Sequence, residues 1–260
     1  MARVYKVPIG KEHLQKLSSE ERVLLLLIGY AANQIMMLQR LVWFCTNGPP
    51  HVNEVELLGS SAQSQMLLRL LVGVLSESWR VVSTRYLQSK LGREYGQLLD
   101  TFGQQALENL KQQFGKGSLV TKIRNNYSFH FPENADVEAA FEAAVNATDS
   151  NLDWAAYFSS YNANTLFQVS EFVFNHGVMH QIGVQDEIES HTLLIKELAR
   201  AANDLVIFAK SFTAAVWKRH FEGEGNAPTA LTVEATSPDS ILIPFLVDPS
   251  SDKPPPRRPG

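Results

Sequence analysis

Three residues that could act together on a phosphate ester lie within residues 123–132 of this 260-residue chain. Arg124 and Asn125 are adjacent, and His130 follows Arg124 after five intervening residues. Arginine carries a permanent positive charge on a planar set of donors that fits a phosphate. Histidine is the side chain best suited to move a proton near neutral pH. Such a pair could cleave RNA without a metal, using the ribose 2′-OH as the nucleophile.

Each residue would have a distinct role in that reaction. His130 would act as general acid or base, Arg124 would hold the scissile phosphate, and Asn125 would orient the pair. Lys116 and Lys122 flank the segment and would extend it into a small basic patch for substrate phosphates. Cleavage by the neighbouring 2′-OH would leave a cyclic phosphate.

A structural interpretation of the same residues stays open, and composition alone favours it. Arg124 could cap carbonyl groups at a helix end, and His130 could pack between two phenylalanines. Helix geometry also sets a condition, because positions six apart in a straight α-helix point about 240° apart. Arg124 and His130 converge only if the helix tightens or ends between Tyr127 and His130, which Pro132 favours, or if each site draws on two protomers.

An Arg-Asn pair followed by a histidine near a helix end, in a helical chain, resembles the HEPN superfamily. The resemblance covers only residues 124–130. It implies a dimeric helical bundle with the motif near the dimer cleft, and in active members a metal-independent endoribonuclease. By family analogy it also implies a role in defence or as a toxin, with an antitoxin as a possible partner. Some relatives only bind nucleotides, so the resemblance does not establish catalysis.

The composition describes a chain that can build a sizeable core. Apolar residues make up 45% of it and the net charge is −4, which argues against a protein that coats nucleic acid through overall charge. Cys45 is the only cysteine, so an intrachain disulfide is impossible and a reducing cytoplasm is expected. The most apolar run, at residues 23–28, is too short to span a bilayer, so no membrane partner is expected.

Apolar periodicity and capping signals predict an all-α bundle of several long helices. Ser18 and Glu21 form a capping box that starts a long helix ending near Thr46, and Gly92 is expected to end the next one. Further helices are expected at residues 11–17, 60–91, 94–114, 136–146, 164–180 and 186–221, with a short motif-bearing helix after Ser118.

The last of these helices carries an apolar seam with heptad spacing, which predicts an internal core face or part of a subunit interface. The expected organisation is one helical domain at residues 1–222, an extended appendage at 223–247 with strand-like composition at 229–235 and 241–247, and a disordered Pro-rich tail at 248–260. The seam comprises Leu194, Leu198, Ala201, Leu205, Phe208, Phe212 and Ala215.

Two other clusters have weaker claims. His176 and His180 could share a helix face and bind a metal, helped by Glu171, Glu187 or His191, but ordinary polar roles are favoured. The charged group Glu77, Arg80 and Arg85 lies beside aromatic residues and could bind bases or phosphate. Surface ion pairing explains the group equally well and is preferred. No cofactor or resident metal is expected.

The sequence therefore favours a HEPN-like endoribonuclease that acts on RNA as a homodimer in the cytoplasm. The alternative is a non-catalytic helical module that binds a partner or a nucleotide, with the same residues in structural roles.

Overall fold

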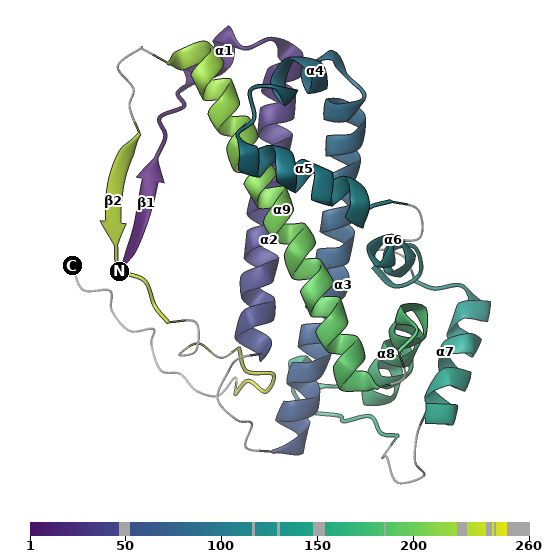
Figure 1. The fold of residues 1–260 in the computed structure, drawn as a ribbon. Coiled ribbons are helices and arrows are strands. Elements are labelled where there is room, and N and C mark those ends of the chain that lie inside the picture. The colour runs from purple at the N-terminus through teal and green to yellow at the C-terminus, as the bar shows by residue number, and fades with distance from the viewer. Residues whose placement is uncertain are drawn as a thin grey trace.

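The computed structural model describes residues 1–46, 53–115, 118–128, 131–147, 154–184, 186–222, 228–237, 241 and 243–248. Within these ranges the chain is a bundle of α-helices with one small two-stranded ribbon at its side (Figure 1), which confirms the all-α prediction. The helices are α1 Lys11–Lys16, α2 Ser19–Thr46, α3 Glu54–Val81, α4 Lys90–Gly96, α5 Thr101–Gln113, α6 Leu119–Ile123, α7 Asn134–Ala147, α8 Gln168–Ile182 and α9 Glu187–Phe221.

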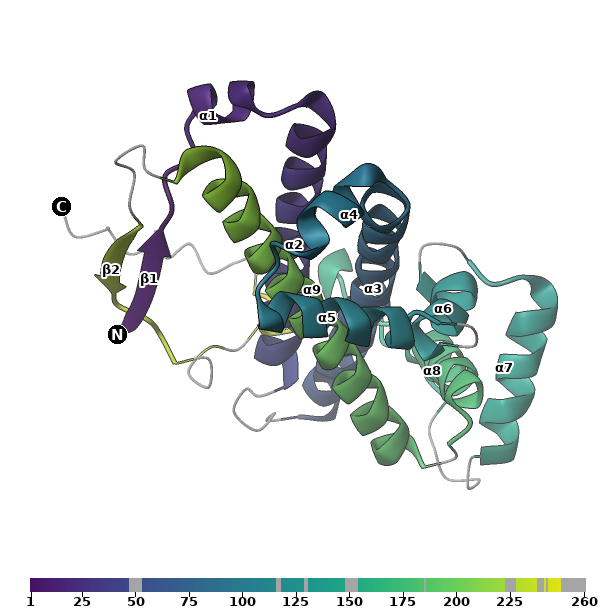
Figure 2. The ribbon, with the colours of Figure 1, turned by 45° about the horizontal axis from the view of Figure 1, so that its top comes forward.

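Three long helices, α2, α3 and α9, form the centre of the molecule. The α2–α3 pair packs along most of its length, and α9 crosses it obliquely with α5 laid across α9 (Figures 1 and 2). Beside α3 a smaller group forms from α6, α7 and α8, in which α7 packs chiefly on α8. This smaller group carries the Arg-Asn segment.

The apolar seam of α9 is the core of the single chain. All seven seam residues are buried, and Phe208 and Phe212 lie edge-on to Tyr86 with ring centroids 5.1 and 5.7 Å away. Tyr95 packs in the same way on Phe212 at 5.2 Å. The core-face interpretation of the seam is therefore confirmed, and a subunit interface would have to use another surface.

A buried carboxylate ties the start of α2 to α4 and to the end of α9. The expected capping box is present, because Ser18 N donates to Glu21 Oε2 at 3.0 Å and Glu21 N donates to Ser18 Oγ at 3.2 Å. Tyr95 Oη donates to Glu21 Oε1 at 2.7 Å, and His220 Nε2 lies 3.1 Å from the same oxygen. Burial alone would raise the pKa of Glu21, but the hydrogen bonds from Tyr95, Ser18 and His220 outweigh it and lower that pKa to about 2.

Several helix boundaries differ from the prediction. The single helix expected at residues 94–114 is two helices, α4 and α5, and Asp100 caps α5 by accepting from Gly103 N at 2.7 Å. The helix expected from residue 60 begins at Glu54, because Asn53 caps it by accepting from Glu56 N at 2.8 Å. Gly92 does not break a helix but lies inside α4, and the break comes at Ser89, which caps α4 through Leu91 N. Between α3 and α4 the chain forms a π-helical segment over Val82–Leu87. The capping side chains decide where these helices begin, and the spacing of apolar residues carries no information about them.

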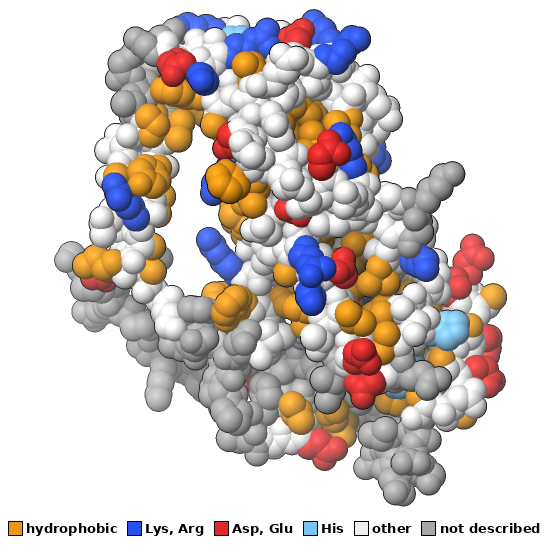
Figure 3. Space-filling model, viewed as in Figure 1, with side chains coloured by type: hydrophobic (Ala, Val, Ile, Leu, Met, Phe, Trp, Pro, Cys, Tyr) orange, Lys and Arg blue, Asp and Glu red, His pale blue; other side chains and the backbone are white. Residues whose placement is uncertain are grey.

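The N-terminal segment pairs with the segment that follows α9. Strand β1, Ala2–Lys6, runs antiparallel to β2, Thr229–Val233, with Val4 opposite Leu231. The ribbon stands beside the helices, and an open passage separates it from them in the space-filling view (Figure 3). The strand-like composition at residues 229–235 thus does form a strand.

The second strand-like segment, at residues 241–247, forms no strand within its described residues and docks on side chains instead. Phe245 N and Leu246 N donate to the two carboxylate oxygens of Glu56 at 2.8 and 3.0 Å. Asn164 accepts from Val247 N at 2.9 Å and donates to Val247 O at 2.8 Å. We call residues 243–248 the strap. Its strand-like composition does not lead to strand pairing here, because a carboxylate and an amide satisfy backbone groups that a neighbouring strand would otherwise pair with.

Gly59 makes the docking of the strap possible. A Cβ at this position would overlap the Phe245 ring, whereas a Cβ at Gly29 of α2 would meet nothing within 4 Å. Gly29→Ala should raise the melting temperature, since alanine favours a helix interior by about 1 kcal/mol. Gly59→Ala should gain the same helix propensity, but the clash with Phe245 should lower the free energy of unfolding by about 1–3 kcal/mol. It should also expose the strap to proteases. Thermal unfolding and limited proteolysis of both variants test this, and equal stabilisation without strap cleavage would contradict it.

Helix α2 has an exposed apolar stripe on the side opposite its buried face. Among the described residues, α2 is also the one helix that is long and apolar enough to cross a membrane, judged by length and composition alone. Core helices of soluble proteins pass the same test, so this is weak evidence for a membrane segment. The exposed stripe comprises Val23, Leu26, Tyr30, Met37 and Leu41.

Candidate functional site

The Arg-Asn segment lies where an α-helix changes to a π-helix. Ser118 caps α6 as expected, accepting from Thr121 N at 3.2 Å. The helix then widens into the π-helical segment Arg124–Ser128. Whether it tightens or ends between Tyr127 and His130 stays a prediction, because residues 129–130 lie outside the described residues. Ile123 and Tyr127 are buried and anchor this turn. Segments with π-helical bonding are rare and often lie at functional sites.

Arg124 shares a carboxylate with a second arginine on α3. Its Nη2 lies 3.2 Å from Glu77 Oε1, and its Nη1 donates to Asn125 Oδ1 at 3.3 Å. Arg80 Nη2 lies 2.7 Å from the other oxygen of Glu77. The expected ion pairing of Glu77 with Arg80 is therefore confirmed, and the structure adds Arg124 to it. Asn125 contacts the arginine that it was expected to orient.

The charges in this group leave a net positive centre. Hydrogen bonding from Arg80 is the main reason that the pKa of Glu77 is lowered, and the charges of Arg80 and Arg124 act in the same direction. Glu77 therefore stays ionised at neutral pH, and two guanidinium groups around one carboxylate sum to one positive charge. The Arg124 side chain is 33% exposed and the Arg80 side chain 69%, so both have donor surface open to a phosphate.

The other expected site residues are only partly placed. Lys122 is exposed on α6, one residue before the buried Ile123, and Asn125 is also exposed. His130 and Lys116 lie outside the described residues. The approach of His130 to Arg124 therefore stays a prediction.

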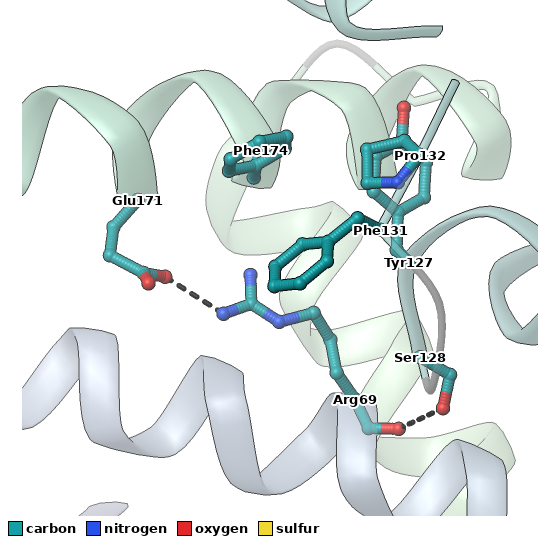
Figure 4. A pocket seen from close by; sticks show the side chains of 7 residues that line it. All are labelled: Arg69, Tyr127, Ser128, Phe131, Pro132, Glu171 and Phe174. Atoms are coloured by element: carbon teal, nitrogen blue, oxygen red, sulfur yellow. Dashed lines mark hydrogen bonds and ion pairs between the residues drawn. The ribbon is translucent and has the colours of Figure 1, made fainter. Parts of the chain in front are cut away.

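A pocket of about 260 Å³ adjoins the end of the π-helical segment (Figure 4). An ion pair crosses it, because Arg69 Nη2 on α3 lies 2.9 Å from Glu171 Oε2 on α8. Ser128 Oγ donates to the carbonyl oxygen of Arg69 at 2.6 Å, which joins the motif segment to α3. The remaining lining residues are Tyr127, Phe131, Pro132 and Phe174.

Sequence reasoning missed Arg69 and considered Glu171 only as a metal ligand. The two residues are 102 positions apart, and nothing in their local sequence marks them as partners. Tyr127, which lines the pocket, was also missed. Its position explains why a glycine, Gly177, stands inside α8. A Cβ at Gly177 would overlap the Tyr127 hydroxyl, so the glycine lets the motif segment pack directly on α8.

The histidines of α8 do not form a recognisable metal site. Within the part of the chain that the structure describes, no group of three His, Cys, Asp or Glu side chains is placed to hold a metal ion. His176 is buried, with Nδ1 2.9 Å from the Phe172 carbonyl oxygen and its ring 4.3 Å from the Phe172 ring.

Cys45 on α2 is buried as expected, and its burial raises the pKa of the thiol.

The charged side chains do not gather into one large patch on the face shown in Figure 3. Lysine and arginine side chains there are interspersed with aspartate and glutamate, in keeping with the net charge of −4. Any polyanion that binds this face would therefore have to be recognised locally.

No protein-family model, no curated protein and no solved structure matches this chain.

Proposed function

We propose that this protein is a metal-independent endoribonuclease of the HEPN-like type, with Arg124 as the phosphate clamp and His130 as general acid and base. Asn125 orients Arg124, and Lys122 and Lys116 add positive charge for neighbouring phosphates. The observation that carries the proposal is the group of two arginines around Glu77, because it presents a net positive charge on a partly exposed turn.

The arrangement suits a charged transition state. A guanidinium held by a carboxylate and by a neighbouring amide is preoriented, so it reorganises little when charge develops on a phosphate oxygen. Glu77 keeps a second arginine as partner when Arg124 turns toward a substrate. The proton transfers fall to His130, whose imidazole can take the 2′-OH proton and return one to the leaving 5′-oxygen.

The test is RNA cleavage by the purified chain with excess chelator present. We expect cleavage to continue, because no step uses a metal, and the products to carry 2′,3′-cyclic phosphates detectable by mass spectrometry. Loss of cleavage on chelation would point to metal-dependent chemistry. Failure to cleave structured and unstructured RNAs would favour the non-catalytic nucleotide-binding module.

We also propose that the active form is a homodimer. Since the α9 seam is internal, the exposed apolar stripe of α2 is the surface that supports this. The stripe has helical spacing over several turns, as an antiparallel helix pair requires.

Light scattering at micromolar concentration should give about twice the chain mass of 29.0 kDa. Leu26→Glu, within the exposed stripe, should shift the protein to monomer without lowering its helix content. A wild-type protein that is monomeric at every concentration would contradict the dimer.

A further inference from the structure

The Arg69–Glu171 pocket combines a charged pair with an almost fully exposed aromatic ring. Phe131 is 98% exposed and lies beside the Arg69 side chain, while Phe174 closes another side (Figure 4). An aromatic ring left in water next to hydrogen-bonding groups is the arrangement that protein sites use to stack a nucleobase. The volume, about 260 Å³, lies below the roughly 300–1,000 Å³ that holds drug-sized ligands, so it suits one base better than a whole dinucleotide.

The charged pair offers a defined order of donors and acceptors. Arg69 contributes N–H donors, and Glu171 contributes carboxylate oxygens that can accept more bonds than the one from Arg69. Their side chains are 16% and 28% exposed, so both remain open to the pocket. A ligand edge that matches this pair must present one acceptor followed by two adjacent donors.

Among the RNA bases that edge belongs to guanine. Its O6 is an acceptor, and its N1–H and N2–H are neighbouring donors that fit the two oxygens of a carboxylate. Adenine and cytosine each place a ring-nitrogen lone pair where the carboxylate needs a donor. Uracil offers a single N–H between two acceptors, so one of them would face the carboxylate.

We infer that the pocket is a guanine-binding subsite, in which Glu171 accepts from N1–H and N2–H, Arg69 donates to O6, and the base stacks on Phe131. The inference builds on the proposed ribonuclease activity, to which it adds a base preference. Ser128 links the two, because its side chain bonds to Arg69 while its backbone ends the π-helical segment that begins at Arg124. A bound guanine would then lie on α3 about two helical turns from the Glu77 that holds Arg124.

Calorimetric titration of 3′-GMP, 3′-AMP, 3′-CMP and 3′-UMP into the full chain tests the subsite without requiring catalysis. We expect 3′-GMP to bind at least tenfold more tightly than the other three. Glu171→Gln should remove this preference, because the amide turns one acceptor into a donor that faces the donors of guanine. Phe131→Ala should weaken 3′-GMP about tenfold through lost stacking, while Phe102→Ala, which removes another well-exposed phenylalanine on α5, should change nothing.

Binding and cleavage together separate the two proposals. Binding of 3′-GMP with no RNA cleavage would support the subsite and overturn the ribonuclease. Cleavage without preference for guanine, with no selective 3′-GMP binding, would overturn the subsite and leave the ribonuclease standing. Since Glu171→Gln also breaks an ion pair, its thermal unfolding is measured alongside, and the exposed Phe131 supplies a variant that should not disturb folding. Equal affinity of wild type for all four nucleotides overturns the inference whatever the variants do.

Discussion

His130→Ala and Arg124→Ala should each lower RNA cleavage by about a hundredfold or more while the protein stays folded. Removing a general acid–base group or a charge-stabilising donor has effects of this order. Arg124→Lys should also fail, because lysine keeps the charge but not the planar fork. Asn125→Ala should fall between these variants and wild type, since it orients Arg124 through one hydrogen bond. Initial rates on a fluorescent RNA substrate measure all four.

The stability of Arg124→Ala distinguishes a catalytic role of Arg124 from a structural one. Its ion pair with Glu77 is partly exposed, and Glu77 keeps Arg80 when Arg124 is removed. The stability loss of Arg124→Ala should therefore stay within about 1 kcal/mol. Arg200→Ala is the control, because it removes an arginine from an exposed ion pair with Glu197 on α9, outside the site, and should retain full cleavage. A large fall in melting temperature for Arg124→Ala, from a wild type that cleaves no RNA, would assign Arg124 a structural role.

Glu21→Gln should lower the stability of the folded chain. The carboxylate is buried and accepts hydrogen bonds from Tyr95 and Ser18, with His220 beside it. An amide cannot accept at both positions, so one donor loses its partner in a buried site. The cost should be about 2 kcal/mol at pH 7, which for a chain of this size lowers the melting temperature by roughly 4–8 °C. Glu142→Gln, at an exposed position of α7, should leave it unchanged.

The effect of Glu21 should depend on pH in one direction. The pKa of Glu21 is about 2 in the folded chain, against an ordinary value of 4.5 for a glutamate side chain in water. Its stabilising contribution is therefore complete above pH 4.5 and is lost as the pH falls from 4.5 toward 2. The difference in melting temperature between wild type and Glu21→Gln should shrink steadily as the pH falls from about 5 toward 2. A gap that stays constant over that range would show that the ionised carboxylate does not matter.

Much of the helical framework follows from the sequence alone, because short-range chemistry decides it. Ser18 and Glu21 lie three positions apart, and their reciprocal bonds form wherever that spacing meets a helix start. The heptad seam of α9 predicted a buried face because residues three and four apart share one side of a helix. The Ser118 cap was predicted from the same local rule. The two caps form from neighbouring residues alone, whereas only the packing of Tyr86 and Tyr95 on the seam decided that it is a core face.

The candidate site depends on partners that are distant in the chain. Arg124 meets Glu77 across 47 positions, and Arg69 meets Glu171 across 102, so no local pattern could pair them. The strap shows the same limit. Its composition is strand-like, yet Glu56 and Asn164 satisfy its backbone from 189 and 83 positions away. Residue types in the sequence thus pointed to a phosphate-binding chemistry. Only the packing of α3 against the motif segment and α8 decided which charges surround Arg124 and which side chains form the pocket beside it.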